Sequence, residues 1–212
     1  MPATASHPGG GKGAPWVPPY SSLVYRHLAP FGTTIAGEAV SYDYRSDPIL
    51  GRALAYWSAK CGARSMPSRR DLDPVVEIPN LLPNLQLIDI VRSRFRFRLI
   101  GSELAHAFGR DYTGLFVDEL FDGQRAKDIC TVYGAVRDAR QSIFMRSCYF
   151  SRRDADLIAN RLYLPLSDNG SNVNMILGAM TFDFGEVAGT SGLWGLSAHL
   201  TGSHVELVPS AP

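Results

Sequence analysis

The first regular pattern of hydrophobic positions along the chain begins just after Asp47 and predicts an amphipathic helix. Asp47 is a favourable N-terminal cap, and Pro48 is favoured at the first helical position. The hydrophobic residues that share one face of this helix are Ile49, Leu50, Ala53, Leu54 and Trp57. Gly62 marks its end. An aspartate followed by a proline then predicts a short helix over residues 73–81.

A different pattern, in which hydrophobic and polar residues alternate, predicts a β-hairpin with strands over residues 82–91 and 94–101. Arg92 and Ser93 form the turn between them. One face of the second strand is hydrophobic and carries Phe95, Phe97 and Leu99. The other face carries the arginines Arg94, Arg96 and Arg98.

Helical patterns follow the hairpin. Residues 102–108 form a short helix in which Ser102 is the expected N-terminal cap and Gly109 the left-handed residue at the end. The pattern over residues 113–121 predicts another short helical segment. Hydrophobic residues at steps of three and four predict the longest helix over residues 122–140.

Three strand patterns complete the central part of the chain, over residues 142–152, 157–166 and 173–184. The order of two strands, three helices and three strands predicts an α+β fold. The expected division of the chain is a mobile tail rich in Gly, Pro and Ser over residues 1–22, an extension with the amphipathic helix over 23–81, a core over 82–184 and an irregular extension over 185–212.

The composition is that of an ordinary globular domain, and the cysteines and missing targeting signals indicate the cellular compartment. The 212 residues are 45% hydrophobic and 19% charged, and the net charge of +1 gives no overall field toward nucleic acid or anionic lipid. Three distant cysteines without a Cys-x-x-Cys pair favour reduced thiols. We find neither a secretory signal nor a membrane span in the sequence. We therefore expect a cytoplasmic protein for which nucleic acid is an improbable partner.

Five segments of the chain, in order, carry a resemblance to a known family. They are "YWSAKCGARSMPSRRDLDP", "LLPNLQLIDIV", "RFRFRLIGSELAHAFGRDYTG", "RLYLPLSDNG" and "ILGAM" within residues 56–182. The chain resembles the PAS domain family, and more narrowly a bacterial subfamily of small stand-alone PAS proteins. The resemblance implies a five-stranded antiparallel sheet with helices on one face, to which this chain adds an N-terminal amphipathic helix.

The resemblance also implies a function. PAS domains are sensory or scaffolding modules that commonly pair with themselves and often bind a small molecule between the sheet and the helices. Because no output region is evident in this chain, a signal would leave through an unidentified protein partner. We expect a non-enzymatic sensory or regulatory protein, present as a homodimer.

This chain lacks the residues to which two cofactors of PAS relatives, flavin and haem, attach. Flavin photosensors of this fold use a cysteine on a short helix, and the matching segment "GRDYTGLFVDEL" has none. Haem-binding members use a histidine on the long helix, and residues 123–140 have none. His106 stands without partner ligands, and Cys130 occupies a hydrophobic position. The sequence supports neither a flavin–cysteinyl nor a haem–histidine site nor a metal, and the cofactor stays unknown.

Catalytic patterns are equally weak. Asp71 and Asp73 are close in sequence, but Asp73 is already expected to cap a helix before Pro74. The segment "GGGKG" lacks the Ser or Thr and the preceding strand of a phosphate loop. No triad or dinucleotide fingerprint is present, so we expect no enzyme.

The expected ligand site lies between the helices and the sheet. Its walls should be Phe108, Tyr112, Phe116, Ile129, Tyr133, Leu162 and Leu164. The same residues could instead fill a closed core, which would leave a pure protein-interaction adaptor.

Two further sets of residues are candidates for interactions. Leu54 and Trp57 would serve an adaptor as a dimerisation face, and Arg69 and Asp71 are expected to dock the preceding helix by charge-assisted hydrogen bonds. An anion or nucleic-acid surface formed by Arg92, Arg94, Arg96 and Arg98 is the third alternative. We favour instead a salt-bridged sheet face, with Asp89 and Asp183 as partners.

Overall fold

The structure is a computed structural model that describes residues 42–121, 123–150, 156–185 and 204–208. The tail predicted over residues 1–22 lies outside the described residues.

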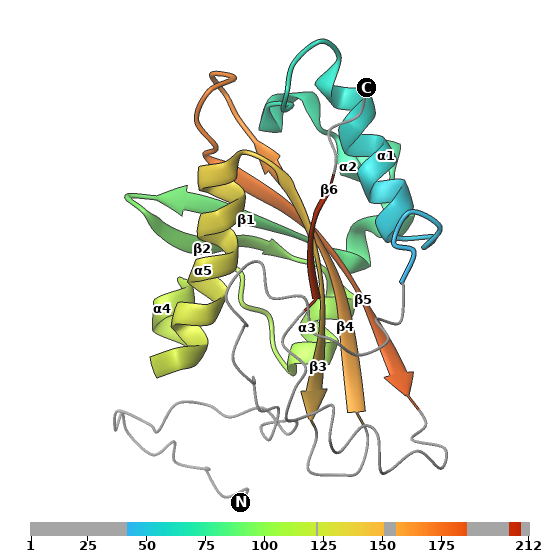
Figure 1. Ribbon diagram of the computed structural model, residues 1–212, viewed down its shortest axis with the longest axis vertical. Helices are drawn as coiled ribbons and strands as arrows, with labels where there is room; N and C mark the ends of the chain where they lie inside the picture. Colours follow the sequence, from blue (N-terminus) through green and yellow to red (C-terminus); the bar gives the residue numbers. More distant parts are fainter. Residues whose placement is uncertain (1–41, 122, 151–155, 186–203, 209–212) are drawn as a thin grey trace, which may run out of the picture.

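An antiparallel sheet forms the centre of the molecule (Figure 1). Its strands are β1 (Leu85–Val91), β2 (Arg94–Ile100), β3 (Ser142–Phe150), β4 (Asp156–Leu166), β5 (Met175–Gly185) and β6 (His204–Val208). They lie in the order β2-β1-β5-β4-β3-β6. The five predicted strands are all present, and their antiparallel pairing confirms the predicted sheet. β6 adds a strand beside β3 in a region that we expected to be irregular.

The helices follow the predicted order. They are α1 (Leu50–Cys61), α2 (Pro74–Glu77), α3 (Ser102–Phe108), α4 (Val117–Leu120) and α5 (Gly123–Ala139), with short 3₁₀ segments at Arg69–Asp71 and Pro79–Asn84. The start of β1 differs from the prediction, because residues 82–84 belong to the second 3₁₀ segment. Pro83 has no N–H to donate to a sheet, so the strand begins only after it.

The hairpin turn and the end of α3 both need residues with a left-handed backbone. Arg92 and Ser93 have φ values of 48° and 67°, as a two-residue hairpin turn requires. Gly109 ends α3 at φ 78°, as predicted. The cap at the other end of α3 differs from the prediction: Gly101 occupies the N-cap, and Ser102 is the first helical residue.

α1 begins at Leu50 with Ile49 at the N-cap, two residues after the predicted cap Asp47, whose side chain binds the backbone at the helix start. The Asp47 Oδ1 accepts hydrogen bonds from the backbone N–H groups of Ile49 and Leu50, both at 2.7 Å. Its Oδ2 accepts a hydrogen bond from the hydroxyl of Tyr42. Burial and this carboxylate raise the pKa of Tyr42 to about 12, so the phenol stays protonated at neutral pH.

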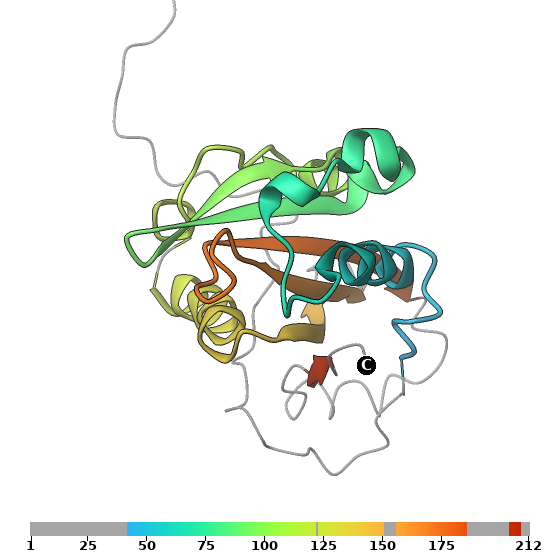
Figure 2. The ribbon, with the colours of Figure 1, turned by 90° about the horizontal axis from the view of Figure 1, so that it is seen from above.

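The sheet separates α1 from α3 and α5. Tyr133 of α5 contacts Tyr163 of β4, with 5.2 Å between ring centroids. Leu162, one residue earlier, pairs across the strands with Phe144, which stacks on Tyr44 beside the start of α1. Because successive side chains of a strand point to opposite faces, α1 and α5 cover opposite faces of the sheet. Figures 1 and 2 show the two helices on either side of the central strands.

Candidate functional site

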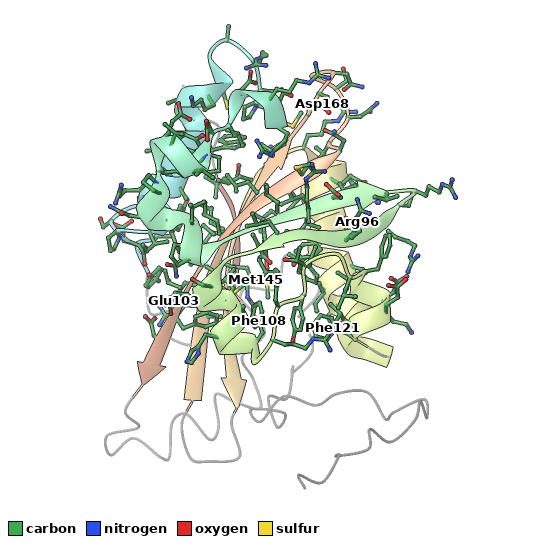
Figure 3. The ribbon with its side chains drawn as sticks, turned by 180° about the vertical axis from the view of Figure 1, so that it is seen from behind. Arg96, Glu103, Phe108, Phe121, Met145 and Asp168 are labelled. Atoms are coloured by element: carbon green, nitrogen blue, oxygen red, sulfur yellow. The ribbon has the colours of Figure 1, made fainter. Side chains whose placement is uncertain are left out.

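The region between the sheet and helices α3, α4 and α5, which we call the helix-side interior, is lined by aromatic rings. Tyr112 lies at its centre and is 5% exposed. Its ring stacks on Phe108 with 5.3 Å between centroids and contacts Phe97 at 5.8 Å and Phe121 at 5.7 Å. Phe108 also contacts Phe182 of β5 edge-on. Figure 3 shows Phe108 and Phe121 on the side of the sheet that carries α3 and α4.

A second group of rings continues this interior toward α5. Tyr133 is 3% exposed and contacts Phe95 of β2 edge-on at 5.4 Å. On its other side it contacts Tyr163 of β4. The guanidinium of Arg137 lies 5.8 Å from the centroid of Phe95 and covers the end of this group. Rings from two strands and one helix therefore form one wall, which suits an aromatic or apolar molecule.

Polar side chains are buried in the same interior. Gln86 of β1 is 1% exposed, and its amide Nε2 has no hydrogen-bond partner among the described residues. It lies over Gly178 of β5, where a Cβ atom would be only 2.6 Å from the Gln86 Cγ atom. An unsatisfied buried amide is uncommon, because it loses its hydrogen bonds to water without replacement.

Buried charges also occur on this side of the sheet. Arg161 of β4 is 2% exposed, and its Nη1 lies 3.9 Å from the sulfur of Met145. Met145, which Figure 3 labels, lies opposite Arg161 on the neighbouring strand β3. Asp128, on α5, is 6% exposed. Both charged residues have interactions within the protein. The helix-side interior is thus aromatic with a few polar groups, the composition that ligand cavities share.

The structure brings together only part of the predicted ligand wall. Phe108, Tyr112 and Tyr133 belong to the helix-side interior, and Ile129 packs against the core from α5. Phe116 lies instead at the outer edge of β2, with the guanidinium of Arg94 3.9 Å from its ring centroid.

Two other members of that wall belong to the opposite face. Leu162 and Leu164 alternate with Tyr163 and therefore face α1. The prediction chose Leu162 and Leu164 because they belong to the more hydrophobic of the two alternating sets along β4. Arg161 and Tyr163 are the residues of this strand that line the interior, and a tyrosine and a charge in a buried strand are the signals that point to them.

The dimerisation face predicted on α1 is partly buried within the chain itself. Trp57 is 7% exposed, and its indole Nε1 donates a hydrogen bond to the carbonyl of Pro165 at 2.9 Å. Leu54 is half-buried. The structure therefore assigns Trp57 to the core between α1 and the sheet.

Asp71 connects the segment after α1 to the end of that helix. Its Oδ2 accepts hydrogen bonds from the backbone N–H of Ser68 and from Nη2 of Arg64, both at 2.7 Å. Arg64 in turn donates to the carbonyl of Lys60 in α1. Arg69 bonds locally, to the carbonyl of Leu72 at 2.7 Å. The docking expected of the pair is made by Asp71 through Arg64.

We expect Asp71→Asn to lower the melting temperature at neutral pH and to make the melting temperature fall less steeply as the pH is lowered. Hydrogen bonds from Ser68 and Arg64 hold the pKa of the Asp71 carboxyl below its usual value. A lowered pKa stabilises the fold above the unfolded pKa of about 3.9, and this contribution is lost as pH falls through the folded pKa. Melting curves between pH 7 and pH 3 measure it.

The difference between the Asp71→Asn variant and the unmodified protein should shrink toward acid pH. Glu103→Gln, at an exposed carboxylate on the surface of α3, is the matched control. Parallel melting curves for all three proteins would contradict the docking role.

The arginines of β2 are engaged by the chain's own carboxylates. Arg94 binds Asp118 through two nitrogens at 2.8 Å each and binds Glu119 at 2.8 Å. These bonds raise the pKa of Arg94 further and lower that of Asp118.

The next two arginines of the row share one carboxylate. Asp89 of β1 is 6% exposed and binds Arg96 at 2.7 Å and Arg98 at 3.6 Å. Asp183, the other expected partner, binds Arg146 instead. Among the described residues, carboxylates pair with Arg94, Arg96 and Arg98 but not with the exposed turn residue Arg92, so the row offers little charge to an anion.

Metal ligands and membrane helices were also sought. No group of three or more His, Cys, Asp or Glu among the described residues could hold a metal ion, and His106 is exposed. Burial raises the pKa of the Cys130 thiol, so the reactive thiolate is disfavoured. Within the described part of the chain, none of the helices has the length and apolar character of a membrane span.

Comparison with known proteins identifies the family. No curated protein matches the chain. Among solved structures, the chain is similar to the LOV protein of Rhodobacter sphaeroides, with 15% identity, a TM-score of 0.36 and coverage of 54% of this chain and 66% of that one. A variant of that protein, RsLOV d2, gives 13% identity with the same TM-score and the same coverage of both chains. The family model described as PAS domain matches residues 46–181, which is more than half of the chain. The chain therefore belongs to the PAS domain family.

Proposed function

We propose that the protein is a non-enzymatic sensory PAS domain that binds a small molecule in the helix-side interior. The observation that carries this proposal is the buried Nε2 of Gln86, which has no hydrogen-bond partner among the described residues. A ligand with an acceptor oxygen or nitrogen would satisfy this amide. The rings around Tyr112 and Tyr133 would contact the apolar or aromatic body of the same molecule.

The absence of a catalytic role is part of the proposal. Asp71 accepts two hydrogen bonds that join the segment after α1 to the helix, and Asp73 accepts a hydrogen bond from the backbone N–H of Val76 at the start of α2. Both carboxylates thus have structural partners. The proposed location is the bacterial cytoplasm, where thiols such as Cys61 stay reduced.

Gln86→Leu is expected to change ligand binding and stability in opposite directions. Leucine removes the donor, so affinity for the ligand should fall about tenfold. It also removes an unsatisfied polar group, so the free energy of unfolding of the ligand-free protein should rise by about 1–2 kcal/mol. Native mass spectra compared with denatured masses measure retained ligand, and chemical denaturation measures stability.

Asn172→Leu, at an exposed amide in the loop before β5, is the matched control and should change neither quantity. Equal excess mass in the unmodified and Gln86→Leu proteins would remove Gln86 from the site. No excess mass, together with unchanged stability of the variant, would contradict the proposed function.

A second candidate function, a PAS-fold interaction adaptor with a closed core, is favoured by exposed hydrophobic residues. Val75 and Val76 of α2 are 64% and 74% exposed, which is unusual for two neighbouring large apolar side chains. The same native mass spectrum discriminates the two functions. A homodimer, or a complex with a protein partner, that carries no excess small-molecule mass would favour the adaptor.

A further inference from the structure

A cavity of about 300 Å³ lies on the side of the sheet that α1 covers, away from the helix-side interior. Its walls come from the turn before α1, from α1 itself, from the connection between α5 and β3, and from the end of β6. The lining residues that determine its chemistry are Arg45, Leu54, Ala55, Trp57, Arg140 and Val208. The volume is that of the smaller ligand sites in proteins.

Local backbone geometry gives the cavity its shape. A Cβ atom on Gly51 would lie 2.0 Å from the carbonyl oxygen of Arg45, so only glycine lets the turn approach α1 this closely. Arg140, another lining residue, directly follows α5 and has a left-handed backbone with φ 56°. This residue ends the helix and directs the chain into β3, whose first residue, Ser142, also lines the cavity.

The chemistry of the lining is apolar and positive. Leu54, Ala55, Trp57 and Val208 supply the apolar part. Arg45 and Arg140 are the charged residues of the lining, both positive, and the other polar residues are neutral. Among the described residues that line the cavity, none is acidic.

Asp43, two residues before Arg45, is not among the residues that line the cavity. Asp43 accepts hydrogen bonds from the backbone N–H of Arg45 at 3.1 Å and from the hydroxyl of Ser46 at 2.5 Å. The Arg45 guanidinium lies over the ring of Tyr44, 5.2 Å from its centroid. Both arginines are exposed, so their guanidinium donors are open to a ligand from solvent.

We propose that this cavity binds a small amphipathic carboxylate, whose apolar body contacts Leu54 and Trp57 and whose anionic group is bound by Arg45 and Arg140. The site is separate from the helix-side interior and adds a second ligand to the proposed sensory function. Because α1 forms one wall, occupancy of this site stabilises the contact between α1 and the sheet.

Octanoate is a suitable probe, because it combines an eight-carbon chain with one carboxylate. The chain has three tryptophans, so replacing Trp16 and Trp194 with Phe leaves one tryptophan, Trp57, whose fluorescence is observed. Trp57 lines the cavity. Titration with octanoate should change the Trp57 emission in a saturable way. Octanamide has the same shape without charge and should bind about tenfold more weakly.

Arg45→Gln and Arg140→Gln should each weaken octanoate binding about tenfold and leave octanamide binding unchanged. Arg52→Gln, an exposed arginine of α1 outside the cavity lining, is the matched control and should bind octanoate normally. No saturable change with octanoate, or equal binding of octanoate and octanamide, would overturn the proposal. Loss of octanoate binding on Gln86→Leu, with the arginine variants unaffected, would assign the ligand to the helix-side interior instead.

Discussion

Trp57→Ala is expected to lower the free energy of unfolding by about 3–5 kcal/mol, because it leaves a large cavity between α1 and the sheet. Trp57 is 7% exposed, and its indole donates a hydrogen bond to the carbonyl of Pro165 at 2.9 Å. The truncation therefore removes both packing and the partner of a backbone oxygen. Urea denaturation followed by circular dichroism, combined with size-exclusion chromatography, measures the effect.

Two further variants make this result specific. Trp57→Phe keeps most of the volume and should lose less stability than Trp57→Ala. Ala59→Ser changes an exposed position of the same helix and should be nearly neutral. A Trp57→Ala protein that keeps its stability and merely dissociates from dimer to monomer would show that α1 is a dimerisation helix rather than part of the core.

Gly101→Ala should be the other strongly destabilising change, with a loss of about 3 kcal/mol in the free energy of unfolding. A Cβ atom at this position would lie 2.3 Å from the carbonyl oxygens of both Leu82 and Pro83. Neither oxygen belongs to a side chain that can turn away, so the 3₁₀ segment and the start of α3 would have to separate. Gly101 also donates its backbone N–H to the carbonyl of Leu85 at 2.8 Å, which holds it in place.

The same substitution elsewhere is the control. Gly134 lies within α5, and the atom nearest to a Cβ there is the Nη2 of Arg137 at 3.9 Å. Gly134→Ala should raise the free energy of unfolding by about 0.5–1 kcal/mol, because alanine is the better helix former. Thermal or urea unfolding of both variants checks the opposite signs. If Gly101→Ala were as stable as Gly134→Ala, the close approach described here would be wrong.

Local patterns in the sequence were sufficient to predict strands β1 to β5 and the order of the helices, but not β6. The alternation from Arg94 to Leu99 identifies β2, and two positive φ values at Arg92 and Ser93 confirm the hairpin turn. The hydrogen bonds from Ile49 and Leu50 to Asp47 join neighbours in sequence, so a role of Asp47 at the start of α1 was also predictable. Contacts within a few residues dominate each of these features.

The candidate site was less predictable, because it depends on which face of the sheet meets which helix. Leu162 and Tyr163 are both nearly fully buried, yet the structure assigns them to opposite faces. A strand covered on both sides has no solvent-exposed face whose polar residues would mark its orientation. Gln86 was missed for a related reason: a single amide within a hydrophobic strand does not reveal whether it finds a partner in the folded protein.

The salt bridges also divide into those that the sequence predicted and those that it did not. The sequence analysis favoured a salt-bridged arginine face and named Asp89, which binds Arg96 and Arg98. It did not identify Asp118 and Glu119, which reach Arg94 from α4, more than twenty residues along the chain. Such a contact depends on how α4 lies against β2, which no local pattern specifies.

The alternation of side chains along β4 has a consequence for how this protein can change over evolutionary time. Arg161 and Tyr163 face one layer of the molecule, and Leu162 and Leu164 face the other. Substitutions at the first pair can alter the helix-side interior while the packing of α1 is retained, and the reverse holds for the second pair. Two separate selective pressures can therefore act on one strand, so a lineage can remodel the helix-side interior without first rebuilding the scaffold that supports it.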